Sequence, residues 1–306
     1  MEPVVKTEGL TKHYGKVVGV ENLDLTVEEG EIFGFLGPNG AGKTTTLRLL
    51  MGMLRPTAGK AEVLGLDAWR QSVAVNAKVG YLPGDAALYD RLTGERHIEY
   101  IADFNGSGRE LGMTLAERLE LDVSRKVEGY SRGMKQKLAL ILALMKKPPL
   151  VILDEPSNGL DPLTQIELYE ILGEFRRDGV TVLFSSHNLP EVERVSGRVG
   201  IIRKGTLVGT ERIEDLRSKR LKNVEIIFPE SVPELVRNIE GVSEVEVSGR
   251  RVQLKLKGDI NPLIALLSGY RVTDFSVTHA SLEDVFLEFY GRQERGAEPS
   301  EGGEAV

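Results

Sequence analysis

A glycine-rich run between an expected strand and an expected helix constrains the fold more than any other part of the sequence. The run GPNGAGKTT, residues 37–45, follows the apolar stretch EIFGFL and precedes TTTLRLLMGML, whose apolar residues recur at helical spacing. Glycines let the backbone approach phosphate oxygens closely, and the N–H groups at the start of the helix supply positive potential. The alternative, a turn that binds nothing, is disfavoured because both flanking elements fit a phosphate-binding loop.

Two side chains in this run add chemistry to the backbone cradle. Lys43 brings a full charge near the terminal phosphates of a nucleotide, and Thr44 can place its hydroxyl on Mg²⁺. We therefore expect the nucleotide to be surrounded by Gly37, Pro38, Asn39, Gly40, Ala41, Gly42, Lys43, Thr44 and Thr45.

A second apolar run, LVIL, ends in two adjacent carboxylates, Asp154 and Glu155. Carboxylates at the end of a hydrophobic strand are costly unless they serve a metal or a reaction. Asp154 would hold Mg²⁺, directly or through water, and Glu155 would be the general base for the water that attacks the γ-phosphate. The alternative is a strand end that leads into an Asp helix cap.

A third signal is EGYSRGMKQKLALILALM, in which Ser131-Arg132-Gly133 precedes an amphipathic helix. A hydroxyl, backbone N–H groups and the positive end of a helix converge there. By itself, this pattern is equally typical of an ordinary serine cap.

Composition excludes several classes of function. The chain has no cysteine, which removes disulfides, thiolate nucleophiles and Cys-based zinc sites, and its four histidines show no metal-ligand spacing. A formal net charge of -7 argues against a dominant nucleic-acid surface. The longest apolar runs, such as residues 138–145, are far shorter than the roughly 20 residues of a membrane-spanning helix. We expect no secretory signal at the N-terminus and no membrane crossing.

The order of expected elements divides the chain into two domains. Strands alternate with helices, then helices dominate residues 84–147, and then strands return, which favours a first domain at 1–215 with a helical insertion. A linker is expected at 216–222. Residues 223–291 alternate in the order β-α-β-β-α-β, typical of a small α+β domain. Residues 292–306 have almost nothing to bury and are expected to form a disordered acidic tail.

Over roughly the first 215 residues, these motifs in this order resemble those of the ATP-binding cassette (ABC) ATPases. Residues 37–44 match the Walker A motif, residues 150–154 match Walker B, and YSRGM at 130–134 lies where the family has its LSGGQ signature. The resemblance implies an α/β P-loop NTPase of ABC type, with a mainly parallel core sheet, an antiparallel β subdomain and a helical insertion, followed by the ferredoxin-like α+β domain. It also implies ATP and Mg²⁺ as cofactors.

The resemblance further implies a site shared by two copies of the chain packed head to tail. Ser131 and Gly133 would contact the γ-phosphate bound by the partner, and Asp161 lies in the matching D-loop, which crosses the interface. His187 matches the switch histidine that touches the γ-phosphate, and Tyr14 matches the aromatic residue that stacks on adenine. The expected catalytic residues are then Glu155, His187 and Lys43.

Two places depart from the family pattern. In the signature, Arg132 and Met134 replace a Gly and a Gln, which we expect function to survive. Gly84 stands where the family has a Gln that reaches Mg²⁺ or the attacking water. Asp85, the next residue, could supply the missing oxygen as a metal ligand; alternatively, Gly84-Asp85 is only a turn and water fills the gap.

Apolar residues next to this turn, Leu88, Tyr89 and Leu92, are expected to be exposed where a membrane partner would dock. The alternative is that they pack under the helical insertion.

The layout of one cassette with a short α+β appendage resembles the ATPase subunits of ABC-2-type exporters, including drug and antibiotic resistance systems. In these, the permease is a separate membrane chain. We therefore expect a homodimeric ATPase that is cytoplasmic and lies peripherally on the inner face of the cell membrane through its permease.

Two other classes compete with this interpretation. A soluble ABC ATPase acting on ribosomes or DNA would show a second cassette, a long coiled coil or a basic surface; none is evident, so no nucleic-acid partner is expected. A purely regulatory nucleotide-binding module would leave Glu155 without a task.

Overall fold

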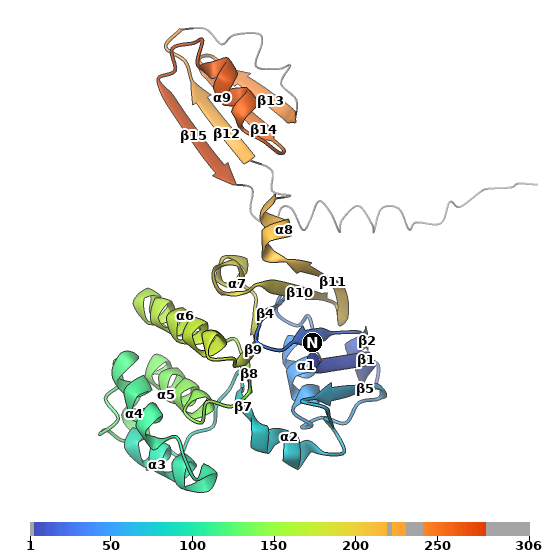
Figure 1. Ribbon diagram of the computed structural model, residues 1–306, viewed down its shortest axis with the longest axis vertical. Coiled ribbons are helices and arrows are strands. Elements are labelled where there is room, and N and C mark those ends of the chain that lie inside the picture. Colours follow the sequence, from blue (N-terminus) through green and yellow to red (C-terminus); the bar gives the residue numbers. More distant parts are fainter. Residues whose placement is uncertain (1–2, 219–221, 231–240, 280–306) are drawn as a thin grey trace, which may run out of the picture. The chain divides into compact units, whose positions relative to one another are not determined.

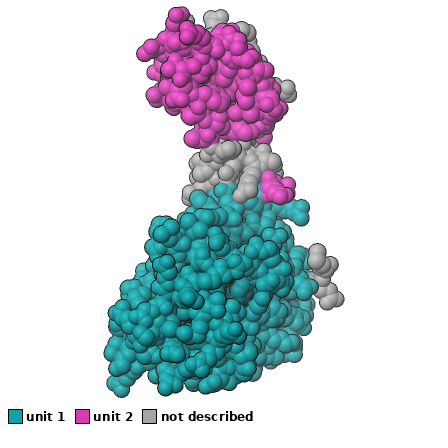
Figure 2. Space-filling model, turned by 60° about the vertical axis from the view of Figure 1, so that its left-hand side comes forward, with its two compact units in different colours: residues 1–213 teal, residues 214–306 magenta. Residues whose placement is uncertain are grey.

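The computed structural model describes residues 3–218, 222–230 and 241–279, which belong to two compact units, 1–213 and 214–306 (Figures 1 and 2). The boundary falls at the start of helix α8 (Ile213–Ser218). The expected linker therefore contains the end of a helix and, at Lys222, the first residue of a strand. Within the domain expected at 223–291, residues 231–240 and 280–291 lie outside the described residues, as does the expected tail at 292–306.

A six-stranded, mainly parallel sheet forms the centre of the first unit. Its order is β11-β10-β4-β9-β8-β7, and only the β10–β11 pair is antiparallel among these neighbours. The strands are β4 (Ile32–Leu36), β7 (Val79–Leu82), β8 (Leu150–Asp154), β9 (Thr181–Ser186), β10 (Arg198–Arg203) and β11 (Thr206–Arg212). Every residue of β4, β8 and β9 is buried, which explains the continuous apolar stretches IFGFL in β4, LVIL in β8 and VLF in β9. Because these strands are parallel, their carboxyl ends meet at one edge of the sheet.

A second, antiparallel sheet has the order β2-β1-β5-β6, with β3 also paired to β1. Its strands are β1 (Pro3–Tyr14), β2 (Val17–Leu23), β3 (Thr26–Glu28), β5 (Ala58–Val63) and β6 (Leu66–Asp67).

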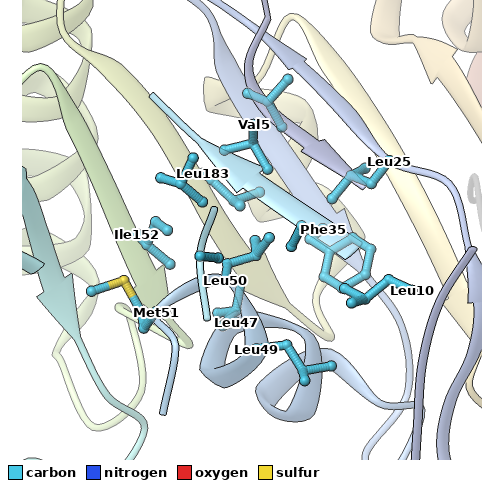
Figure 3. Close-up of a cluster of buried hydrophobic side chains, with 14 of the residues drawn as sticks. Val5, Leu10, Leu25, Phe35, Leu47, Leu49, Leu50, Met51, Ile152 and Leu183 are labelled. Atoms are coloured by element: carbon cyan, nitrogen blue, oxygen red, sulfur yellow. The ribbon is translucent and has the colours of Figure 1, made fainter. Parts of the chain in front are cut away.

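Helix α1 (Lys43–Leu50) ties the two sheets together through one hydrophobic cluster (Figure 3). Its Leu47 and Leu50 are fully buried with Val5 of β1, Phe35 of β4 and Leu183 of β9. Each such side chain stabilises the fold by roughly 1.5–3 kcal/mol through burial. The start of α1 is thereby fixed relative to the end of β4.

The helical insertion consists of α3 (Gly94–Asn105), α4 (Arg109–Arg118), a short 3₁₀ turn (Val127–Gly129) and α5 (Arg132–Leu144), with α3, α4 and α5 in mutual contact (Figure 1). The remaining helices of this unit are α2 (Ser72–Lys78), α6 (Pro162–Arg177) and α7 (Leu189–Val195). Arg118 links the insertion to α6: Nε lies 2.6 Å from Glu167 Oε1, and the terminal nitrogens donate to both oxygens of Glu174 at 2.6 and 3.1 Å.

The second unit contains a four-stranded antiparallel sheet of order β13-β14-β12-β15. Its elements are β12 (Lys222–Ile227), β13 (Val242–Ser248), β14 (Arg251–Leu256), α9 (Asn261–Leu267) and β15 (Asp274–His279). Val224 and Ile226 alternate into a core with Leu263 and Leu267 of α9. The strand order is that of a ferredoxin-like fold, as the sequence predicts.

Candidate functional site

The glycine-rich loop connects β4 to α1 and is shaped by two close approaches. A Cβ on Gly37 would lie 2.4 Å from the carbonyl oxygen of Ile202, and Gly42 has φ 109°, which favours glycine. Gly42 is also the N-cap of α1 and carries no side chain that could occupy the first N–H groups of the helix. The backbone donors of α1 therefore remain available to an anion.

Asp154 lies at the end of β8 and is only 1% exposed, yet both carboxylate oxygens are satisfied. Thr44 donates its hydroxyl to Oδ2 at 2.7 Å, and Ser185 donates to Oδ1 at 2.6 Å. The structure thus brings together two residues 110 positions apart that were expected at the metal.

The Thr44 hydroxyl and the Asp154 carboxylate are oxygen donors of the kind that Mg²⁺ prefers. Within the described residues, no cluster of three or more metal-type side chains occurs. The donor set fits an ion that keeps most of its shell as water and substrate phosphate, which is the usual behaviour of Mg²⁺.

Glu155 follows Asp154 with φ 50°, a left-handed conformation that costs a non-glycine residue roughly 1 kcal/mol or more. Its Oε1 lies 3.1 Å from Lys43 Nζ, and its Oε2 lies 2.8 Å from His187 Nδ1. Lys43 also donates to the carbonyls of Gly37 at 2.5 Å and Pro38 at 3.2 Å. The three residues expected to be catalytic therefore form one connected group.

Two further residues, which are not among those expected from the sequence, hold this group. Ser185 Oγ accepts the N–H of Glu155 at 3.0 Å while it donates to Asp154. Gln136, on α5, donates to the carbonyls of Glu155 at 3.4 Å and Pro156 at 3.1 Å. A signal for Ser185 exists, since a polar residue ends the apolar run VTVLFS; Gln136 has no such local signal.

The expected signature and D-loop residues lie against each other. Ser131 caps α5 by accepting the N–H of Met134 at 3.2 Å, and a Cβ on Gly133 would lie 2.6 Å from the carbonyl oxygen of Gly159. Asp161 caps α6, accepting from the N–H of Thr164 at 3.0 Å and from its hydroxyl at 2.6 Å, which lowers the pKa of Asp161. In the described part of the chain, no hydrogen bond or ion pair joins these residues to 37–45.

Tyr14 lies at the end of β1, close to the beginning of α1. A Cβ on Gly19 would meet the Tyr14 ring at 2.8 Å and the methyl group of Thr45 at 3.2 Å. The Tyr14 ring and the Thr45 methyl group therefore both lie beside Gly19. The ring is about half exposed.

Gly84 lies directly beside the carboxylate of Asp154, where a Cβ would be 3.2 Å from Oδ2. Asp85, next to it, is exposed. The structure therefore places the Gly84-Asp85 turn at the expected metal position.

The expectation of three exposed apolar residues beyond this turn is partly wrong. Leu88 and Leu92 are only partly exposed. The chain folds back here onto the 3₁₀ turn, whose Val127 N–H donates to the carbonyl of Leu92 at 2.9 Å. Tyr89 is 63% exposed, and it is joined by Tyr100 at 55% and Phe104 at 82%, both on α3. We name Tyr89, Tyr100 and Phe104 the α3 aromatic surface. The buried His97 fixes it by accepting the N–H of Tyr89 on Nε2 at 3.0 Å.

Comparisons with known proteins agree with this geometry. A model of the ABC transporter family matches residues 20–158, and a model of the DrrA1-3-like ATP-binding protein C-terminal domain matches residues 212–290. The daunorubicin resistance ATP-binding protein DrrA2 of Streptomyces coeruleorubidus is 32% identical, covering 97% of this chain and 98% of its own. The chain belongs to the ABC transporter ATP-binding family.

Other relatives of this ABC ATPase support the assignment. The bacitracin transport ATP-binding protein BcrA of Bacillus licheniformis is 31% identical, covering 95% of this chain and 98% of its own. A solved ATP-binding subunit of an ABC transporter is 29% identical with a TM-score of 0.65, covering 70% of this chain and 92% of that one. The cassette MJ0796, solved as a dimer bound to ADP and Pi, shares the fold with a TM-score of 0.63 at 24% identity.

These findings confirm the predicted fold class and the identification of the protein as an ATP-hydrolysing ABC subunit. In the part of the chain that the structure describes, no helix has the length and apolarity needed to cross a bilayer.

We predict that Ser185→Ala lowers the free energy of unfolding by about 2 kcal/mol, because it leaves the buried Asp154 Oδ1 and the Glu155 N–H without partners. ATP turnover should also fall by about tenfold, because both carboxylates lose their alignment. Urea unfolding followed by fluorescence of the single tryptophan, Trp69, in the first unit measures stability, and phosphate release measures turnover.

Thr181→Val is the matched control for this prediction. Thr181 is fully buried at the other end of β9, and its hydroxyl accepts the N–H of Gly30 at 2.9 Å. This variant should be destabilised to a similar extent but should retain normal turnover. Equal loss of turnover in both variants would show that Ser185 acts only through stability.

Proposed function

We propose that this ABC ATPase powers the export of a drug or an antibiotic through a separate membrane permease. Near full-length similarity to a daunorubicin resistance protein and a bacitracin transport protein supports this proposal, since it extends through the C-terminal unit. The observation that carries it is the connected group of Lys43, Glu155 and His187 beside the Thr44–Asp154 pair. A nucleotide-binding module without turnover would not need that group.

The ion pair between Lys43 and Glu155 suggests how ATP prepares the site. A γ-phosphate in the loop would compete with Glu155 for Lys43, because its negative charge is larger and lies among the backbone donors of α1. Once Lys43 turns to the phosphate, the Glu155 carboxylate is released from its ion pair with Lys43. It can then accept a proton from the attacking water, while His187 fixes its orientation.

Mg²⁺ fits this site next to the Thr44 hydroxyl and the Asp154 carboxylate. When bound, it would neutralise charge on the β- and γ-phosphates.

A second copy of the chain would complete the site. Ser131, Gly133 and Asp161 form a surface next to Gly159, but within the described residues they make no polar contact with their own phosphate loop. We assign their contact with ATP to the loop of the partner in a head-to-tail dimer. The existence of a related cassette as a dimer supports this arrangement.

We predict that Glu155→Gln lowers ATP hydrolysis by at least about 100-fold, because the variant keeps the shape of the side chain and removes the base. ATP binding should persist, and a stable dimer should accumulate in the presence of Mg²⁺ and ATP. Phosphate release and size-exclusion chromatography measure the two effects.

Glu110→Gln, an exposed glutamate on α4, serves as the control and should hydrolyse ATP at the normal rate. Normal turnover in Glu155→Gln would refute the assignment of the base. A hydrolysis-deficient variant that stays monomeric with ATP would refute the shared site.

We propose that Asp85 supplies an oxygen to Mg²⁺, directly or through water, because Gly84 faces Asp154 without a side chain. Asp85→Ala should therefore raise the Mg²⁺ concentration for half-maximal turnover by about fivefold, since fewer ligands weaken a site that relies on few protein oxygens. The measurement is a Mg²⁺ titration of ATPase activity at saturating ATP.

Asp90→Ala is the control for this titration. Asp90 lies in the same loop and pairs with Lys135 at 2.9 Å, away from Asp154. Its removal should leave the Mg²⁺ dependence unchanged. An unchanged dependence in Asp85→Ala would show that water alone occupies the position.

The α3 aromatic surface is the proposed contact with the permease. An exposed group of three aromatic residues on the helical insertion requires a partner to cover it. The edge-to-face packing of Tyr89 on Tyr100, with ring centroids 6.3 Å apart, gives the surface a fixed shape.

We predict that the double variant Tyr100→Ser, Phe104→Ser loses at least about tenfold in affinity for membranes that contain the permease, because two aromatic rings no longer become buried. The membrane-bound fraction after sedimentation measures this, and turnover of the isolated protein should be unchanged. Val247→Ser, an exposed apolar residue on β13, is the control. An unaltered membrane-bound fraction in the double variant would contradict the assignment of this surface.

A further inference from the structure

A buried carboxyl group that the proposed chemistry does not use lies behind the Glu155–His187 pair. Glu191, on α7, is only 6% exposed. Burial raises the pKa of Glu191, and the nearby charge of Glu155 raises it further. Hydrogen bonding lowers this pKa but does not cancel the rise. Burying a carboxyl group costs free energy, and the proposed reaction does not use this one. The presence of Glu191 at this position therefore needs another explanation.

On one side, Glu191 binds the segment that carries His187. Ser186 donates its hydroxyl to Glu191 Oε2 at 2.6 Å, and the same hydroxyl oxygen accepts the N–H of Asn188 at 2.9 Å. The carbonyl of Ser186 accepts the N–H of Gly37, in the phosphate loop, at 3.1 Å. Ser186 is therefore the point where the loop, the His187 segment and Glu191 meet.

On its other side, Glu191 contacts the segment that follows Glu155. The hydroxyls of Ser157 and Tyr169 lie near its carboxyl group, and the pKa of Tyr169 is raised by burial and by the charge of Glu191. The Oε1 atom of Glu191 has no partner within regular hydrogen-bond geometry. The carboxyl group thus lies between the two segments and makes its hydrogen bond to Ser186.

We propose that Glu191 is a positioning residue that holds His187 in register with Glu155 for hydrolysis; this rests on the proposed roles of those two residues. The Ser186 hydroxyl has one proton and two acceptors in reach, Glu191 Oε2 at 2.6 Å and the carbonyl of Asn188 at 3.3 Å. With Glu191 present, the proton points to the carboxylate and the oxygen accepts from Asn188. Without Glu191, the hydroxyl turns, and the residues on either side of His187 lose their fixed orientation.

The test begins with Glu191→Ala in the full chain. We expect kcat for ATP to fall by about tenfold while KM for ATP stays within about twofold, because alignment is lost and the phosphate loop is intact. Glu191→Gln should stay within about twofold of the parent, because the amide oxygen still accepts from Ser186. Glu170→Gln, an exposed carboxylate beside Tyr169 on α6, is the control and should be normal.

A double-mutant cycle separates positioning from a purely structural role. In a His187→Ala background, Glu191→Ala should lower kcat by less than about twofold, since the residue it orients is gone. If the two effects multiply instead, Glu191 does not act through His187 and the inference is wrong. Loss of kcat in Glu191→Gln equal to that in Glu191→Ala would also overturn it.

Two further variants separate the positioning role from a folding defect and from a failure of the proposed function. If Glu191→Ala does not fold, Ser186→Ala removes the donor from the other side and should give the same kcat loss and the same coupling to His187. Glu155→Gln tests the proposed function separately: normal hydrolysis there refutes the base, whereas lost hydrolysis there together with normal turnover in Glu191→Ala refutes only the positioning role.

Discussion

The buried carboxylate of Asp154 is the constraint on which the site depends. Burying an unpaired charge at 1% exposure would cost several kcal/mol. The carboxylate is therefore paired with two hydroxyl groups, which come from different parts of the chain. Ser185 arrives because β8 and β9 are parallel neighbours with Asp154 opposite Ser185. Thr44 arrives because the apolar cluster around Leu47 and Leu50 fixes α1 against both sheets. The hydrophobic core therefore sets the position of the oxygens proposed to hold Mg²⁺.

The charges around this carboxylate form one balanced system. Three carboxyl groups lie in this region, those of Asp154, Glu155 and Glu191. Lys43 forms an ion pair with one oxygen of Glu155, and His187 contacts the other oxygen. The other compensation comes from hydroxyls, which can reorient without changing charge. A nucleotide adds more negative charge to this system, so its phosphates compete with Glu155 for Lys43, and the proposed Mg²⁺ would offset part of that charge. This links nucleotide occupancy to the ion pair that holds Glu155.

Local sequence patterns were sufficient for the motifs and for most elements, but not for the contacts between them. The phosphate loop and the Asp154-Glu155 pair are recognisable because each needs only a few adjacent residues of fixed type. Ser185 contacts the Asp154 carboxylate, and Gln136 contacts the backbone of Glu155 and Pro156. Both come from segments whose neighbours depend on the sheet order and on helix packing. Leu88 and Leu92 were predicted to be exposed because loop position alone does not reveal that the chain folds back over them. The periodicity of apolar residues describes a single helix or strand. The burial of the two leucines and the contacts of Ser185 and Gln136 depend on how two elements pack together.

The packing of the signature on the D-loop shows which of the two glycine positions in the family signature has room for a side chain in this fold. A side chain at Gly133 would meet the carbonyl of Gly159 at 2.6 Å, a backbone group that cannot move aside cheaply. One position earlier, the side chain of Arg132 extends over Gly159, 3.6 Å from where a Cβ would lie, and remains exposed. The first glycine of the signature is therefore open to replacement by a long side chain, whereas the second is fixed by contact with Gly159. The guanidinium adds positive charge to the face that carries Ser131, the face that the proposed dimer presents to the phosphates of its partner.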